Sequence, residues 1–195
     1  MAEQSMRPMF STTAARLRIR KIEAAAGFSL FELLILIAMI LIIAVVAVPN
    51  LLRSRIAGNQ ASAIGDVRTI TAALTSYKII YADGYPPSFS SLGGTTGATP
   101  SCDQSGLLDP ALATPPNQKS GYQFSYSGEN GSLPTSASGC SLAGFSAFLV
   151  TATPLSVGTT GSVSYCSDDP LVIREHAQGK AIRDQAACEH LPPLQ

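Results

Sequence analysis

The stretch Gly27–Val48, with the sequence GFSLFELLILIAMILIIAVVAV, decides the fold of this 195-residue chain. Its last sixteen residues are all Ala, Val, Ile, Leu or Met, and only Ser29 and Glu32 interrupt the run before them. As an α-helix, residues 28–48 are about 31 Å long, close to the ~30 Å hydrocarbon core of a bilayer. A buried helix of a small soluble domain is the alternative, but a surface helix keeps a polar face and this segment has none. The pattern predicts a membrane-spanning helix.

The flanks of this run indicate its orientation. Residues 1–27 carry five basic and two acidic side chains, a net charge of +3. Basic residues before an apolar run favour a cytoplasmic N-terminus. The end of the run, Ala47-Val48-Pro49-Asn50, is a poor match to the small-residue site at which secretory signals are cut. We therefore expect residues 1–27 to stay inside the cell and the remainder to be exported.

The motif Gly27-Phe28-Ser29-Leu30-Phe31-Glu32-Leu33-Leu34, after basic residues and before the apolar run, resembles the N-terminal signal of type IV pilins and type II secretion pseudopilins. The resemblance covers about the first fifth of the chain. It implies that a prepilin peptidase removes a leader of residues 1–27 by cutting after Gly27 and methylates the new amino terminus at Phe28. Two features depart from the family pattern. Residues 24–26 are all alanine where a basic residue is usual, and Phe31 is bulkier than the common aliphatic.

The resemblance also implies an α+β fold of the pilin type. A long N-terminal helix has a transmembrane, polymerising half (28–49) and an amphipathic half (50–83), with a helix kink at Pro49. This helix packs on a small antiparallel sheet in a globular domain at 84–195. The implied partners are other copies of the chain in a helical homopolymer, the prepilin peptidase, the pilus or secretion machinery, and the inner membrane before assembly. The finished filament is extracellular, or periplasmic as a pseudopilus.

Glu32 is the charged residue inside the apolar run, where a lone carboxylate costs roughly 2.5–3.5 kcal/mol on insertion scales. Cleavage after Gly27 creates an ammonium group at Phe28, and in a staggered assembly the amine of one subunit reaches Glu32 of another, as the resemblance implies. The alternative is that Glu32 reaches the headgroups of the membrane interface from its place near the helix end. A periplasmic binding module that is merely tethered needs neither the Gly27–Phe28 junction nor Glu32.

Beyond Pro49 the apolar residues recur at steps of three, four and seven, which predicts an amphipathic helix to about Ala82. The apolar positions are Leu52, Ile56, Ala63, Val67, Ile70, Leu74, Tyr77 and Tyr81. The wetter face is expected to hold Arg53, Arg55, Asn59, Gln60, Asp66, Arg68 and Lys78. Pro49 removes one backbone donor and is expected to bend or locally melt the helix.

Residues 84–195 read as a loop-rich β-domain of three or four short antiparallel strands. The strand signals are the alternation Tyr122-Gln123-Phe124-Ser125-Tyr126 and the runs 143–152, 162–166 and 171–174. The tetrapeptide Ser167-Asp168-Asp169-Pro170 is expected to be a solvated turn, and residues 92–118 a loop. Asn130-Gly131-Ser132 matches an N-glycosylation sequon, for which we expect no use.

All four cysteines, Cys102, Cys140, Cys166 and Cys188, lie beyond the apolar run. An even number confined to the exported part favours disulfides, and four cysteines allow three pairings. We expect Cys102–Cys140, which would tie down the loop region, and Cys166–Cys188, which would hold the C-terminal tail to a strand. A zinc site is disfavoured because no C-x-x-C pair exists and His176 and His190 are isolated.

Signals for catalysis are missing from the sequence. It contains no G-x-S-x-G, phosphate-loop or H-E-x-x-H motif, so we expect no enzyme, no catalytic residue, no cofactor and no metal. Asp168-Asp169 is either a polar turn or a calcium site like the one in major pseudopilins. The 13 basic and 13 acidic residues balance to zero, which argues against nucleic acid as a partner. The net charge of zero is the sum of +3 for residues 1–27 and −3 for the rest of the chain.

Overall fold

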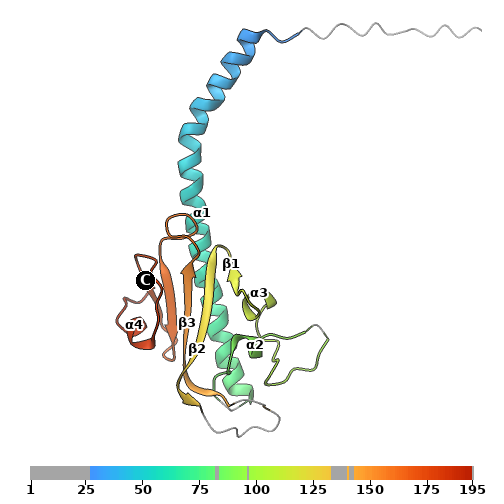
Figure 1. Cartoon of the computed structure of the whole chain (residues 1–195), viewed down its shortest axis with the longest axis vertical. Coiled ribbons are helices and arrows are strands. Elements are labelled where there is room, and N and C mark those ends of the chain that lie inside the picture. Colours follow the sequence, from blue (N-terminus) through green and yellow to red (C-terminus); the bar gives the residue numbers. More distant parts are fainter. Residues whose placement is uncertain (1–26, 82–83, 96, 133–139, 141–142, 195) are drawn as a thin grey trace, which may run out of the picture. The chain divides into compact units, whose positions relative to one another are not determined.

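The structure is a computed structural model that describes residues 27–81, 84–95, 97–132, 140 and 143–194. The leader expected at 1–26 lies outside these residues. The chain divides into two compact units, one ending at Ile43 and the other beginning at Ala44. The N-terminal helix α1 runs from Leu30 to Tyr81 and crosses this division (Figure 1). It begins two residues later than expected and continues through Pro49 without interruption, so the helix does not melt there.

Five strands form one antiparallel sheet in the order β1-β2-β3-β4-β5. Their bounds are Gln118–Lys119, Tyr122–Ser132, Phe145–Pro154, Ser164–Asp168 and Ile173–His176. The α+β fold expected from the sequence, with a long N-terminal helix followed by a small antiparallel sheet, is confirmed. The expected strand count was low because β1 is only two residues long, too short for a period to show.

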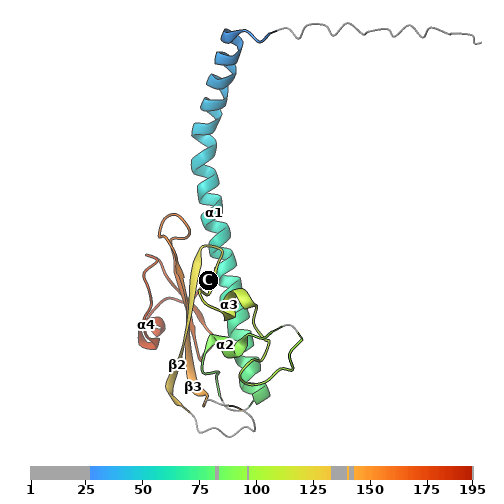
Figure 2. The same ribbon diagram turned by 45° about the vertical axis from the view of Figure 1, so that its right-hand side comes forward.

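The second half of α1 packs on one face of this sheet (Figure 2). Because alternate residues of a strand point to opposite faces, one set of side chains from each strand meets the helix. The shared core includes Val67, Ile70, Leu74 and Tyr77 from α1, and Tyr122, Phe124, Phe148, Val150, Ala152 and Tyr165 from the strands. These are the helix positions at which the sequence period placed the buried face.

The other face of the sheet carries a smaller core under the helix α4, Gln185–Glu189 (Figure 2). Leu149 and Cys166 from the strands contact Ile182 and Cys188 there. Sequence periodicity missed α4 because five residues make little more than one helical turn. Its start is marked by Asp184, whose side chain accepts a hydrogen bond from the Ala187 N–H at 2.7 Å.

Two short helices, α2 (Phe89–Leu92) and α3 (Pro110–Ala113), lie between α1 and the sheet in sequence. The expected structureless loop at 92–118 is therefore wrong in part, since it contains α3 and the first residue of β1. β1 and β2 form a hairpin with the two-residue loop Ser120-Gly121, in which both φ angles are positive, 49° and 75°. That geometry matches the right-handed twist of a hairpin.

Candidate functional site

The N-terminal residues of the described chain form the candidate assembly site. Gly27, Phe28 and Ser29 precede α1, and the Leu33 N–H donates to the Ser29 carbonyl at 3.1 Å. Glu32 lies in the first helical turn and is solvent-exposed. Phe28 is 67% exposed. Gly27, Phe28 and Glu32, for which the sequence predicts roles in processing and assembly, are therefore exposed at the start of the helix.

The first half of α1 and the residue Phe28 before it expose a mostly apolar surface. The large apolar side chains of this surface are all at least 39% exposed, namely Phe28, Leu30, Phe31, Leu33, Leu34, Ile35, Leu36, Ile37, Met39, Ile40, Leu41, Ile42, Ile43, Val45, Val46, Val48, Leu51 and Leu52. By length and composition, α1 could cross a membrane. None of its most apolar stretch is buried by the rest of the chain. A patch of this size on a protein marks contact with lipid or with other protein.

Pro49 lies inside α1, where the Asn50 side-chain amide donates to the Val46 carbonyl at 3.1 Å. This bond occupies a carbonyl one residue beyond the one that the proline leaves without its helical donor. The helix is continuous here, and the kink expected from the sequence stays a prediction.

The wetter face of the amphipathic half differs from expectation most at Asp66, while Asn59 and Gln60 are half-buried and donate to the Thr160 carbonyl and the Ser162 hydroxyl. Arg53, Arg55, Arg68 and Lys78 are exposed as expected, but Asp66 is buried. Asp66 Oδ1 lies 2.7 Å from Lys119 Nζ, which comes from the β1–β2 hairpin. The expectation of a solvated Asp66 was wrong because the period of a helix shows which side a residue occupies, and not that a lysine 53 positions away covers it.

The four cysteines form the two disulfides expected from the sequence, Cys102–Cys140 and Cys166–Cys188. The first spans 38 residues and the second 22. The Tyr77 hydroxyl donates to the Cys102 carbonyl at 2.8 Å, so the loop that carries this cysteine is also bonded to α1. The second disulfide joins β4 to α4 within the smaller core. Together they cross-link the loop-rich parts of the domain, where a small core benefits most.

Asp168 contradicts the expected solvated turn at 167–170. Ser167 and Asp168 belong to β4, and both are fully buried. Neither carboxylate oxygen of Asp168 has a hydrogen-bond partner among the described residues, and the same holds for Arg174 Nε. Burial raises the pKa of Asp168, an effect that the positive charge of Arg174 opposes in part. The turn pattern D-D-P concealed this, since polar residues before a proline are typical of exposed turns.

Asp169, the next residue, faces a different group of side chains. Its Oδ1 accepts a hydrogen bond from the Tyr85 hydroxyl at 2.5 Å and lies 3.9 Å from Lys78 Nζ. The same ammonium lies 4.3 Å from the centre of the Tyr85 ring. Burial, followed by the hydrogen bond and negative charge of Asp169, raises the pKa of Tyr85 above its usual range. Asp168 and Asp169 thus point to separate sites, which is unlike a paired calcium ligand.

The described residues contain no cluster of three or more His, Cys, Asp or Glu side chains that could hold a metal ion. His176 lies in β5 and His190 follows α4. Burial raises the pKa of the Tyr165 hydroxyl to about 12, and the negative charges of Tyr122 and Glu175 add to this effect.

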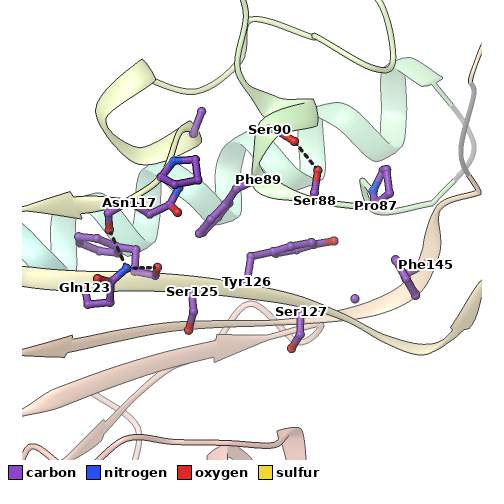
Figure 3. Close-up of a pocket in the computed structure, with 14 residues that line it drawn as sticks. Pro87, Ser88, Phe89, Ser90, Asn117, Gln123, Ser125, Tyr126, Ser127 and Phe145 are labelled. Atoms are coloured by element: carbon purple, nitrogen blue, oxygen red, sulfur yellow. Dashed lines mark hydrogen bonds between the residues drawn. The ribbon is translucent and has the colours of Figure 1, made fainter.

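A groove of about 450 Å³ beside β2 is the site that sequence reasoning missed. Figure 3 shows Phe89 and Tyr126 on one side of β2 and Ser125 and Ser127 on the other. The centres of the Phe89 and Tyr126 rings are 5.4 Å apart. The lining residues come from four separate segments between Pro87 and Phe145, so no local motif in the sequence marks the groove.

A long apolar helix packed on an antiparallel sheet is compatible with a pilin-like subunit. No known protein family, curated protein or solved structure matches the chain in sequence or structure comparisons.

Proposed function

We propose that the chain is the structural subunit of a bacterial type IV pilus-type filament, cut after Gly27 and assembled through the apolar half of α1. The observation that carries this proposal is the exposed, mostly apolar surface from Phe28 to Leu52, whose polar side chains are Ser29, Glu32 and Asn50 and which begins at a junction that resembles the prepilin type. In the membrane lipid covers this surface. When the helix leaves lipid, the same area must be covered by helices of other copies, because apolar surface in water costs about 25 cal/mol per Å².

Glu32 determines how neighbouring subunits pair in this assembly. Its carboxylate projects from an apolar helix that carries no basic residue between Phe28 and Asn50. The ammonium created at Phe28 by cleavage is the nearest positive charge that processing provides. A pair between Glu32 of one subunit and the Phe28 amine of the next offsets the cost of burying either charge alone. It also sets the axial stagger of neighbouring helices.

The proposed topology follows from charge and from the disulfides. The +3 leader stays in the cytoplasm, where the prepilin peptidase meets the Gly27–Phe28 bond. The domain with Cys102–Cys140 and Cys166–Cys188 lies in the oxidising periplasm and then on the filament surface. This is a structural role, to which we assign no catalytic activity. A pseudopilin of a type II secretion system would share every step but remain periplasmic.

The test compares Gly27→Ala and Glu32→Gln with wild type in the bacterium that makes the protein, by mass spectrometry of membranes and of filaments sheared from cells. We expect wild-type filaments to contain a chain that begins with methylated Phe28. Gly27→Ala should stay uncut in the membrane. Glu32→Gln should be cut normally but be reduced by about tenfold or more in the sheared fraction, because the charge pair that sets the register is lost.

Matched controls keep the chemistry of each change but move it elsewhere. Gly58→Ala adds a methyl group at an exposed helix position with open space around it, and Glu129→Gln removes a carboxylate in the sheet domain. Both should be processed and sheared like wild type. Normal filaments from Gly27→Ala and Glu32→Gln together would refute the assembly mechanism. Wild-type protein found only as uncut membrane monomer would instead favour a tethered periplasmic binding module.

A further inference from the structure

The groove beside β2 has one wall made of strand and another made of helix and loop. The strand wall consists of β2 residues from Gln123 to Gly128, and the facing wall includes Phe89 and Ser90 of α2 with Ala113 and Pro115. Side chains from both faces of β2 line it, which places the groove at the edge of the sheet and not over one face (Figure 3). None of its lining residues is charged.

The edge of β2 loses its partner strand at this point. β1 pairs with β2 only through Lys119↔Tyr122 and Gln118↔Gln123. One further bond joins the Phe124 N–H to the Asn117 carbonyl at 2.9 Å. The preceding residues, Pro115 and Pro116, have no backbone N–H and cannot continue the ladder. On this side, therefore, β2 beyond Phe124 continues for eight residues, Ser125–Ser132, without a described strand beside it.

The register shows which backbone groups face the groove. In an antiparallel ladder both polar groups of one residue point to the same neighbour, and successive residues alternate. Gly121 faces β3, since its carbonyl accepts from the Leu155 N–H at 3.0 Å, and Phe124 faces Asn117. The even-numbered residues Tyr126 and Gly128 therefore direct N–H and C=O away from β3. No backbone hydrogen bond joins either of them to a described residue outside the strands.

We propose that this groove binds an extended, uncharged peptide segment of a partner protein, which adds a strand beside β2. The N–H and C=O groups of Tyr126 and Gly128 supply main-chain hydrogen bonds, the recognition mode of peptides that extend a sheet. Two such residues match a segment of roughly five residues in the partner. The absence of charged lining residues excludes charged side chains from the groove, because burying an unpaired charge is costly.

The aromatic residues provide a seat for one apolar side chain of that peptide. Phe89 is held in the core, and the Tyr126 hydroxyl donates to the Pro86 carbonyl, so both rings are fixed before binding. Phe145 closes one end, where its ring lies so near Gly128 that a Cβ at that position would come within 2.0 Å.

The experiment measures amide hydrogen exchange by NMR on the full chain, ¹⁵N-labelled, in detergent micelles. The probe is the capped peptide acetyl-Thr-Val-Thr-Val-Thr-amide. Without it, the amides of Tyr126 and Gly128 should exchange faster than those of Ser125 and Ser127, which bond to β3. Saturating peptide should slow exchange at Tyr126 and Gly128 by about tenfold or more. Two analogues of the probe are N-methylated, one at the threonines and one at the valines. The analogue whose methylated residues face β2 should fail to bind, and the other should bind normally.

A blocked groove provides the matched control. The described residues contain no free cysteine, so Ser90→Cys, exposed on the far wall, can be labelled selectively with N-phenylmaleimide. The label should weaken peptide binding by about tenfold or more, whereas the same label at Ser156→Cys, exposed on the β3–β4 loop, should leave it unchanged. Peptide binding that leaves Tyr126 and Gly128 unprotected would overturn the proposal, as would the absence of binding at millimolar peptide. Protection that instead grows with protein concentration alone would assign the groove to a second copy.

Discussion

At the scale of single residues, two aspartates that are adjacent in the sequence differ in burial and in hydrogen bonding. Asp168 and Asp169 are adjacent, yet one is fully buried with no described hydrogen-bond partner and the other is bonded to Tyr85 and close to Lys78. The difference follows from strand alternation, since Asp168 is the last residue of β4 and faces α4. A buried carboxylate without partners destabilises the fold in its charged form.

Asp168 leads to a prediction about pH. Its folded-state pKa is raised by burial, so the protonated form favours folding, and this contribution is full below the unfolded pKa near 4 and is lost as the pH rises through the folded pKa. We expect Asp168→Asn, which has the same shape without the charge, to raise the free energy of unfolding at pH 7 by about 1 kcal/mol. The gain should vanish near pH 3. Denaturant unfolding at both values measures it; an Asp168→Asn protein less stable than wild type at pH 7 would contradict it.

The pair Asp66–Lys119 leads to the opposite expectation for a mutation. Here the carboxylate is buried and has its partner at 2.7 Å. Lys119→Met leaves the aliphatic length but removes the ammonium, so Asp66 loses its charged partner and keeps only a weak contact with Ser62 at 3.5 Å. We expect a loss of about 1–3 kcal/mol in the free energy of unfolding. Lys180→Met, at an exposed site, is the control and should change little. If Asp66→Asn fails to recover part of the loss in the double variant, the pair is not its cause.

At the scale of elements, α1 contains two glycines, Gly58 and Gly65, which lower the stability of a helix relative to alanine. Gly65 is an exposed residue of α1, and a Cβ added there meets nothing within 4 Å. Because glycine in a helix interior costs about 1 kcal/mol relative to alanine, Gly65→Ala should stabilise the monomer by about that amount. Thermal unfolding of the monomer in detergent measures the change. Gly128→Ala serves as a contrast and should destabilise, since its Cβ would overlap the Phe145 ring. A destabilised Gly65→Ala would show that residue 65 is not open.

The elements also show how far the sequence predicts this fold. Long elements with a sustained period were predicted well: α1 from its apolar run and its three-four spacing, and β2 from Tyr122-Phe124-Tyr126. The four-residue helices α2 and α3 and the two-residue β1 were missed because they complete barely one period. The groove depends on where β1 stops, which is a matter of register and tertiary placement. Gly27, Phe28 and Glu32, by contrast, could be proposed from the sequence because their motif is contiguous, and their roles stay predictions.

At the scale of the whole molecule, the two kinds of apolar surface lie in different stretches of the chain. The large exposed side chains are concentrated between Phe28 and Leu52, whereas the core begins at Ala63 and includes no residue of the membrane-like run. The core of the sheet domain therefore does not depend on the first half of α1. In the proposed filament, polymer contacts and domain stability would be separable properties.

This separation predicts that residues 53–195 fold alone. The fragment keeps both disulfides, the helix face from Ala63 to Tyr77 and every strand. We expect it to be soluble and monomeric without detergent, because it lacks the surface that requires lipid or other copies. Its free energy of unfolding should lie within about 1 kcal/mol of that of the full chain in detergent, since residues 30–52 add no buried side chain to the core.

Size-exclusion chromatography with light scattering and denaturant unfolding measure both properties. A fragment of residues 44–195, which restores Val45, Val46, Val48, Leu51 and Leu52, is the matched control and should associate in the absence of detergent. If residues 53–195 also associate, the sheet domain has a second apolar surface. The exposed Ile79 and Ile80 at the end of α1 are then the first residues to mutate. If residues 53–195 fail to unfold cooperatively, the first half of α1 contributes to the domain, and assembly and stability are coupled after all.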